Sequence, residues 1–168
     1  MSTAQDEARG IKVGPYEFDN PQMIKARRLW ADLLRRDGEL EEGDMELIKF
    51  FHVENIRDRL MADIINPYAW DEAEYNALFR GVVRPDAAMV DRMKAATQAC
   101  RNLSELSPEA DHPPMLLITS MCQWLVLNLP LAQIGARIAL RIDPDYHLAK
   151  LMLTMTSRGL EPDWALQE

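Results

Sequence analysis

Apolar residues recur every three or four positions along most of this chain, which is the period of an amphipathic α-helix. Capping residues, prolines and glycines separate these stretches. The pattern predicts helices over residues 21–37, 44–65, 71–80, 86–103, 111–127, 130–142 and 144–159. The second of these either continues through residues 52–55 or bends there. No β-type alternation persists beyond a few residues outside positions 11–18.

The predicted helix boundaries rest on local chemistry. Asn20 offers a capping side chain before Pro21, whose missing N–H costs nothing at the first helical position. Asp71 followed three residues later by a glutamate is typical of a capping box. Asp111 is predicted to cap the helix that follows it, and Gly38 is predicted to end the first long helix.

Small residues mark one helix near the C-terminus, at Ala132, Ala136 and Ala139, and Pro144 opens the next helix. This spacing lets two helices lie close together and is that of the second helix in a tetratricopeptide-type hairpin. The preceding helix lacks the aromatic and glycine positions that such repeats use and has Ser120 and Gln123 there instead, so one degenerate unit is expected rather than an array. The predicted fold class is all-α: about seven helices in stacked antiparallel hairpins.

The predicted organisation is a single domain over residues 19–160. Residues 1–18 are polar at first and then carry Ile11, Val13, Tyr16 and Phe18, so a flexible tail followed by an arm that docks on the body is expected. Residues 161–168 are predicted to form a C-terminal tail.

Composition excludes several classes of function. With 168 residues, 48% apolar and 27% charged, the chain is an ordinary globular protein. The net charge of −8 argues against direct binding to nucleic acid, which basic clusters normally provide. The most apolar run, Met115 to Leu129, is shorter than the roughly 20 residues of a bilayer span. Residues 1–10 lack the apolar core of a secretory signal, so a cytoplasmic protein with no membrane partner is expected.

Two segments resemble the C-terminal helical half of an actinobacterial domain-of-unknown-function family, DUF4192. Residues 55–60 contain the Arg57-Asp58 pair followed by leucine, and residues 136–149 form an alanine-rich helix leading into an Asp-Pro-x-Tyr-x-Leu-Ala turn. Full-length members carry a further N-terminal domain, and Leu127-Asn128-Leu129 replaces their glycine-containing turn. The resemblance implies a stand-alone version of the helical half, of phage or mobile-element origin, and implies no activity.

No residues suggest a metal site, a cofactor or catalysis. His52, His112 and His147 have no second histidine or cysteine at the spacing that places two ligands on one helix face. Phosphate-binding loops and nucleophile elbows are absent from the sequence. Cys100 and Cys122 occupy apolar helix positions and are predicted to be reduced, buried thiols, with a disulfide as the less favoured alternative. The ten methionines are predicted to fill the core, with a methionine-lined contact surface as the alternative.

Three features are candidates for contacts with a partner. Arg57 and Asp58 point about 100° apart on a helix, so each is expected to reach a neighbouring helix rather than the other, chiefly to hold the fold. A basic first helix precedes an acidic segment, which could present a bipolar docking surface. Trp164 could anchor a partner from an exposed tail. The acidic candidates are Glu41, Glu42, Asp44 and Glu46.

These observations predict a non-catalytic intracellular module that binds a protein partner through a groove or an exposed helix face. The alternative hypothesis is an acidic inhibitor that mimics nucleic acid and occupies a basic cleft of a host or defence protein. Salt dependence distinguishes the two, because a mimic loses affinity steeply as salt rises. Neither hypothesis identifies the partner or the oligomeric state.

Overall fold

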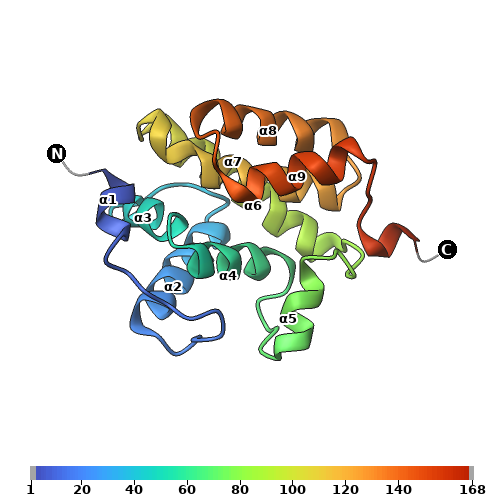
Figure 1. Cartoon of the computed structure of the whole chain (residues 1–168). Coiled ribbons are helices and arrows are strands. Elements are labelled where there is room, and N and C mark those ends of the chain that lie inside the picture. The colour runs from blue at the N-terminus through green and yellow to red at the C-terminus, as the bar shows by residue number, and fades with distance from the viewer. Residues whose placement is uncertain (1–2, 167–168) are drawn as a thin grey trace.

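A computed structural model describes residues 3–166, and this part of the chain holds nine α-helices, three short 3₁₀-helices and no strand (Figure 1). The predicted all-α fold is confirmed. The α-helices are α1 (Ala4–Ala8), α2 (Pro21–Arg35), α3 (Leu47–Phe51), α4 (Glu54–Ile65), α5 (Glu72–Leu78), α6 (Ala87–Glu105), α7 (His112–Leu125), α8 (Leu129–Ile142) and α9 (His147–Ser157).

Two helices exceed the predicted seven, and both have a local cause. The predicted helix over residues 44–65 bends, because Val53 is extended (ψ 108°) and separates α3 from α4. The other addition is α1, which lies in the predicted tail. Thr3 caps it: its hydroxyl accepts from the Asp6 amide, and the Asp6 carboxylate accepts from the Thr3 amide.

The helices form two groups joined by α6 (Figure 1). The C-terminal helices α7, α8 and α9 pack on one another along the upper edge of the figure, and α6 contacts α7 on one side and both α2 and α4 on the other. Because α4 is enclosed by α2, α3, α5 and α6, nine of its twelve residues are buried. The chain therefore has one continuous core.

Several predicted caps are present. The Asn20 side chain accepts from the Gln22 amide at 2.9 Å and begins α2, and Asp71 accepts from the Glu74 amide at 3.1 Å and begins α5. The predicted cap at Asp111 is wrong, because this carboxylate makes no capping bond to α7. It is buried beside His52 instead, 2.9 Å from the imidazole Nε2, and so fixes the bend after α3.

Apolar side chains of moderate size fill the core. Trp30 and Phe51 meet edge to face, with ring centroids 5.5 Å apart, and the Trp30 Nε1 donates to the Leu60 carbonyl at 3.0 Å. Seven of the ten methionines are buried, as the core-filling interpretation predicted. They are Met23, Met61, Met89, Met93, Met115, Met121 and Met152.

The alanine-spaced helix packs as predicted. Ala132, Ala136 and Ala139 have no solvent exposure, so α8 lies close against its neighbours α7 and α9. At Gly135 the two helices approach so closely that an added Cβ would collide with the Ser120 Oγ of α7. Small residues therefore set the distance between α7 and α8.

The N-terminal segment differs from the predicted flexible tail. Residues 4–8 form α1, which packs on α3, and both Ala8 and Val13 are buried. The Val13 carbonyl accepts from Asn55 Nδ2 at 2.6 Å, so the arm docks on α4 as expected. Residues 1–2 and 167–168, which belong to the predicted tails, lie outside the described residues.

Candidate functional site

The Arg57–Asp58 pair lies on α4 and serves the fold. Arg57 donates to the Asp58 carboxylate from Nε at 3.0 Å and from Nη2 at 2.8 Å. The prediction that these neighbours do not pair is therefore wrong, because the long arginine side chain folds back over the aspartate. The predicted contact beyond the helix is present: Nη1 donates to the Tyr146 hydroxyl at 3.0 Å, in the α8–α9 turn. Burial raises the pKa of Asp58, and Arg57 opposes that shift.

Two of the acidic partner candidates are engaged by Arg36 at the end of α2. Asp44 is buried, forms an ion pair with Arg36 and accepts from the Glu41 amide at 2.8 Å. The Glu41 carboxylate is exposed and lies 3.6 Å from the Arg36 Nε. Glu42 is exposed and has no ion-pair partner among the described residues. The acidic segment thus packs against the end of the helix that precedes it.

Glu46, in the 3₁₀-helix that follows, adds a further contact between this segment and α2. Its carboxylate lies 2.8 Å from Lys25 of α2 and 2.9 Å from Lys49 of α3. Hydrogen bonds from these two lysines lower the pKa of Glu46. Ion pairs of Lys25 and Arg36 thus join the basic helix to the acidic segment, so parts of the two predicted poles meet within one molecule.

Trp164 contacts the body of the protein. Its indole Nε1 donates to the Leu125 carbonyl at 3.0 Å, and its backbone amide donates to Gly81 at 2.9 Å. The Arg84 guanidinium lies 5.1 Å from the ring centroid. Trp164 is half-buried and belongs to a 3₁₀-helix over Asp163–Leu166. Trp164 therefore anchors the described part of its own C-terminal segment.

The outer face of α8 carries three exposed apolar side chains. Leu131, Ile134 and Ile138 are spaced three and four residues apart, and they are 48%, 50% and 38% exposed. Each lies on the side of the helix opposite the buried alanines, because α-helical residues at these spacings share one face. A helix that is apolar on both faces is normally covered on both. In this structure one face packs internally and the other is open.

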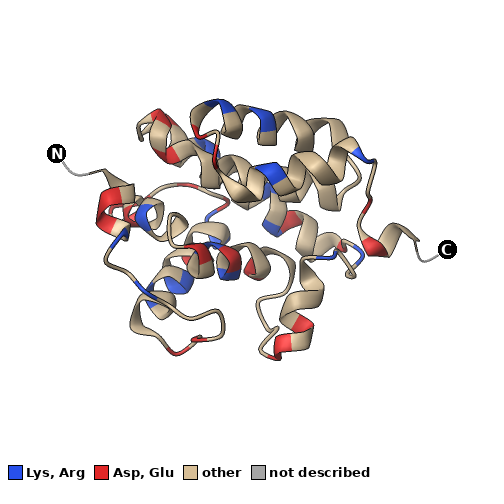
Figure 2. Ribbon diagram, viewed as in Figure 1, with Lys and Arg blue, Asp and Glu red and all other residues tan. Residues whose placement is uncertain are grey.

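Basic residues border this apolar face. Arg137 and Arg141 of α8 are exposed and have no ion-pair partner among the described residues. Between residues 112 and 160 the chain has four basic and two acidic residues, a formal charge of +2 in a chain of −8. Figure 2 shows this contrast, with blue and tan along α8 and α9 and most of the red elsewhere.

The turn that leads into α8 exposes a further apolar residue in an uncommon conformation. Leu127 has φ +66°, the left-handed region that usually requires glycine at the end of a helix, and its side chain is 41% exposed. This backbone geometry costs a non-glycine residue about 1–2 kcal/mol.

The remaining candidate chemistry is structural. Cys100 and Cys122 are buried and free, and burial raises the pKa of the Cys122 thiol to about 12. The imidazole rings of His52 and His112 are half-buried. His52 is hydrogen-bonded to the Asp111 carboxylate, and His112 is hydrogen-bonded to the Ser104 carbonyl. Within residues 3–166, no group of three or more His, Cys, Asp and Glu side chains is arranged to hold a metal ion. None of the helices in this range is long and apolar enough to cross a bilayer.

The sequence analysis did not identify the α8 face, because it considered only the alanine positions of this helix. The signal was present: Leu131, Ile134 and Ile138 alternate with the alanines, which makes α8 apolar on two sides.

Comparisons with known protein families, curated proteins and solved structures find no match for this chain. The DUF4192 resemblance, the tetratricopeptide likeness and the phage origin stay predictions.

Proposed function

We propose that this protein is a non-catalytic interaction module, and that the outer face of α8 binds an amphipathic segment of a protein partner. The observation that carries the proposal is the apolar stripe of Leu131, Ile134 and Ile138, which is open to solvent on a helix whose other face is packed. Exposed apolar residues at helical spacing are a recognised anchor pattern for a partner helix.

Charge indicates what the partner segment carries. The stripe is bordered by Arg137 and Arg141 and by no carboxylate of α8, so acidic residues beside the partner's apolar anchors would complement it. A second copy of the same face would bring like charges together. The partner we propose is therefore an acidic amphipathic segment of another protein.

The Leu127 turn supports the same assignment. A leucine in the left-handed region lowers the stability of the free protein, and its side chain is exposed beside the start of α8. Glycine would relieve the conformational cost but would remove the apolar side chain. A contact between the exposed Leu127 side chain and the partner would offset this cost in the complex.

Capture followed by reconstitution tests the proposal. The full chain, the Ile134→Glu variant and the Leu106→Glu variant would each be used to capture proteins from extract of the native cell, and the partner would then be purified. Leu106 is a matched control, because it is 65% exposed and lies at the end of α6. We expect Ile134→Glu to lower affinity by about 100-fold, since a charge buried at an apolar contact is costly, and Leu106→Glu to leave it unchanged.

Three outcomes would contradict the proposal. The first is equal affinity of the Ile134→Glu variant and the unmodified chain for the purified partner. The second is a homodimer that Ile134→Glu converts to a monomer, which would identify a second copy as the occupant. The third is binding to vesicles of anionic lipid that Ile134→Glu abolishes, which would identify a membrane surface.

The acidic-mimic alternative has less support. Asp44 and Glu46 are paired with cations of the same molecule, so the acidic segment offers fewer free carboxylates than its sequence suggests. A mimic would lose affinity for its target steeply between about 0.05 and 0.5 M salt, whereas an apolar contact loses little. A salt series on the purified complex separates the two functions.

A further inference from the structure

A groove of about 640 Å³ lies between α2, the α4–α5 turn and the first turns of α6. Its volume falls in the range of small-molecule sites, roughly 300–1,000 Å³. Four arginines and three aspartates line it, together with Ala31, Leu34 and Tyr68. The proposed contact at the α8 face involves none of these residues.

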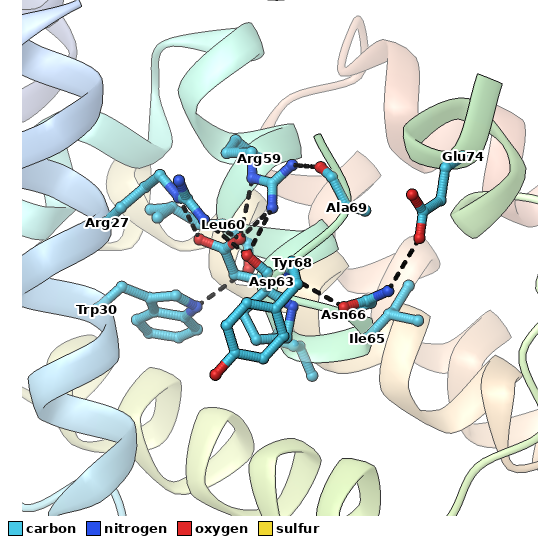
Figure 3. A network of polar contacts seen from close by, with 12 residues as sticks. Arg27, Trp30, Arg59, Leu60, Asp63, Ile65, Asn66, Tyr68, Ala69 and Glu74 are labelled. Carbon is cyan, nitrogen blue, oxygen red and sulfur yellow. Dashed lines mark hydrogen bonds and ion pairs between the residues drawn. The ribbon is translucent and has the colours of Figure 1, made fainter. Parts of the chain in front are cut away.

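A buried ion-pair network forms one wall of the groove (Figure 3). Asp63 accepts from Arg27 through Nε at 2.8 Å and Nη2 at 3.0 Å, and it also accepts from Arg59 Nε at 2.9 Å. Arg27 further donates to the Pro67 carbonyl and lies 4.5 Å from the Trp70 ring centroid. One carboxylate therefore faces two guanidinium groups, which leaves this wall with an excess positive charge.

Two arginines that line the groove are fixed by hydrogen bonds from only one edge of the guanidinium group. Arg27 uses Nε and Nη2 for its hydrogen bonds. Arg92 likewise uses Nε and Nη2, which donate to the carbonyls of Ile64 and Ile65 at 2.7 and 2.9 Å. The Nη1 groups of both have no hydrogen-bond partner among the described residues. Arginines fixed in this way are pre-organised to bind an anion, since little side-chain entropy remains to be lost.

A third cation and a flat ring complete the groove. Arg28 of α2 lines it and makes no hydrogen bond or ion pair within residues 3–166. Tyr68 of the α4–α5 turn also lines it, and its side chain is 79% exposed. Figure 3 shows the Tyr68 ring on the same side of the network as Trp30. An exposed ring at the edge of a cationic groove offers a stacking surface for a planar group.

We infer that this groove binds a small phosphorylated molecule with a flat ring, of the size of a nucleoside monophosphate. Three arginines with unpaired N–H groups offer more donors than the two oxygens of a carboxylate accept, whereas a phosphoryl group has three terminal oxygens. The ring of the ligand would lie against Tyr68 and Leu34. Asp91, exposed at the edge and without a partner in the described part of the chain, could accept from an amino group of that ring.

The test is a titration of the full chain with adenosine monophosphate, adenosine and inorganic phosphate, followed by calorimetry and by ¹⁵N NMR. We expect saturable binding of the monophosphate and affinities at least about tenfold lower for adenosine and for phosphate alone. Arg28→Ala and Tyr68→Ala should each lower the affinity about tenfold. Neither side chain is buried, so both variants should fold. Arg158→Ala, an exposed arginine at the end of α9, should change nothing.

Several results would overturn the inference. One is no saturable binding up to about 10 mM monophosphate, which is weaker than any useful site of this size. Another is unchanged affinity in both Arg28→Ala and Tyr68→Ala. Equal affinity for phosphate and for the monophosphate would also overturn it, because the ring would then contribute nothing. NMR shifts confined to α8 and α9 would place the ligand elsewhere.

Discussion

Arg59 and Asp63 lie one turn apart on α4 and form an ion pair of 2.7 Å in which the arginine side chain has no solvent exposure. Arg59 also donates to the carbonyls of Ala69 and Pro67. The rings of Phe18 and Tyr75 lie 5.0 and 5.4 Å from its guanidinium. One buried cation thus ties the N-terminal arm, α4 and the α4–α5 turn together.

Asp63→Asn should destabilise the protein by about 3–5 kcal/mol, because it leaves two guanidinium groups facing each other without a counter-charge. The measurement is urea unfolding at neutral pH. Asp91→Asn is the control, because Asp91 is exposed and should change the free energy of unfolding by less than about 0.5 kcal/mol. A loss below about 1 kcal/mol in Asp63→Asn would show that the network does not depend on this charge.

Glu46 should make stability sensitive to acid. Its pKa is lowered in the folded state by Lys25 and Lys49, so the stabilisation is present above the unfolded value of 4.5 and is lost as pH falls through the lower folded pKa. Glu46→Gln should therefore lower stability by about 0.5–1 kcal/mol at pH 7 and by little in strong acid. Urea unfolding across pH measures this, and an equal loss at every pH would contradict it.

At the contact between α7 and α8, Ser120→Ala should raise the stability of the protein and Gly135→Ala should lower it. Within residues 3–166 the buried Ser120 Oγ has no hydrogen-bond partner, so its removal should stabilise the protein by about 1 kcal/mol. Gly135→Ala would place a methyl group against this oxygen and should cost about 1–3 kcal/mol.

The double variant should recover part of the loss from Gly135→Ala, because the two groups compete for one space. Thermal unfolding of the four proteins in this cycle gives the coupling energy. Gly10→Ala is a control, since no atom of the described residues lies within 4 Å of a Cβ at that position. Strict additivity of the two substitutions would contradict the assigned contact.

Leu127→Gly should raise stability and weaken binding to the proposed partner. Glycine adopts φ +66° without steric cost, so we expect a gain of about 0.5–1 kcal/mol. Val126→Gly is the matched control, because Val126 is also exposed but has φ −101°, and glycine there should lower stability. Unfolding and binding would be measured on the same samples, and a less stable Leu127→Gly protein would contradict the assigned strain.

Local features of the fold could be predicted from the sequence. Caps such as Asn20 and the alanine spacing of α8 act within a few residues, so their effect is visible in the order of side chains. Ion pairs between residues far apart in the sequence could not be predicted in this way. Asp111 reads as a helix cap, yet it faces His52 from a position 59 residues away along the chain.

The candidate sites were less accessible to prediction than the fold. Arg59 follows the Arg57–Asp58 pair in the sequence, and nothing in its neighbours marks it as the fully buried arginine. Its environment comes from Phe18, Trp70 and Tyr75, which other segments supply. The α8 stripe was visible as a pattern, but whether Ile134 faces a neighbour or solvent depends on how the helices assemble.

The opposite charges of the two helix groups give the molecule a permanent electric dipole. Since residues 112–160 carry +2 and the whole chain −8, the remainder carries the excess of negative charge. An acidic protein that diffuses toward this molecule is attracted to the end that holds α8 and α9, which carries the positive formal charge. Such a field turns the two molecules before they touch, which raises the rate of productive collision and makes that rate fall with ionic strength.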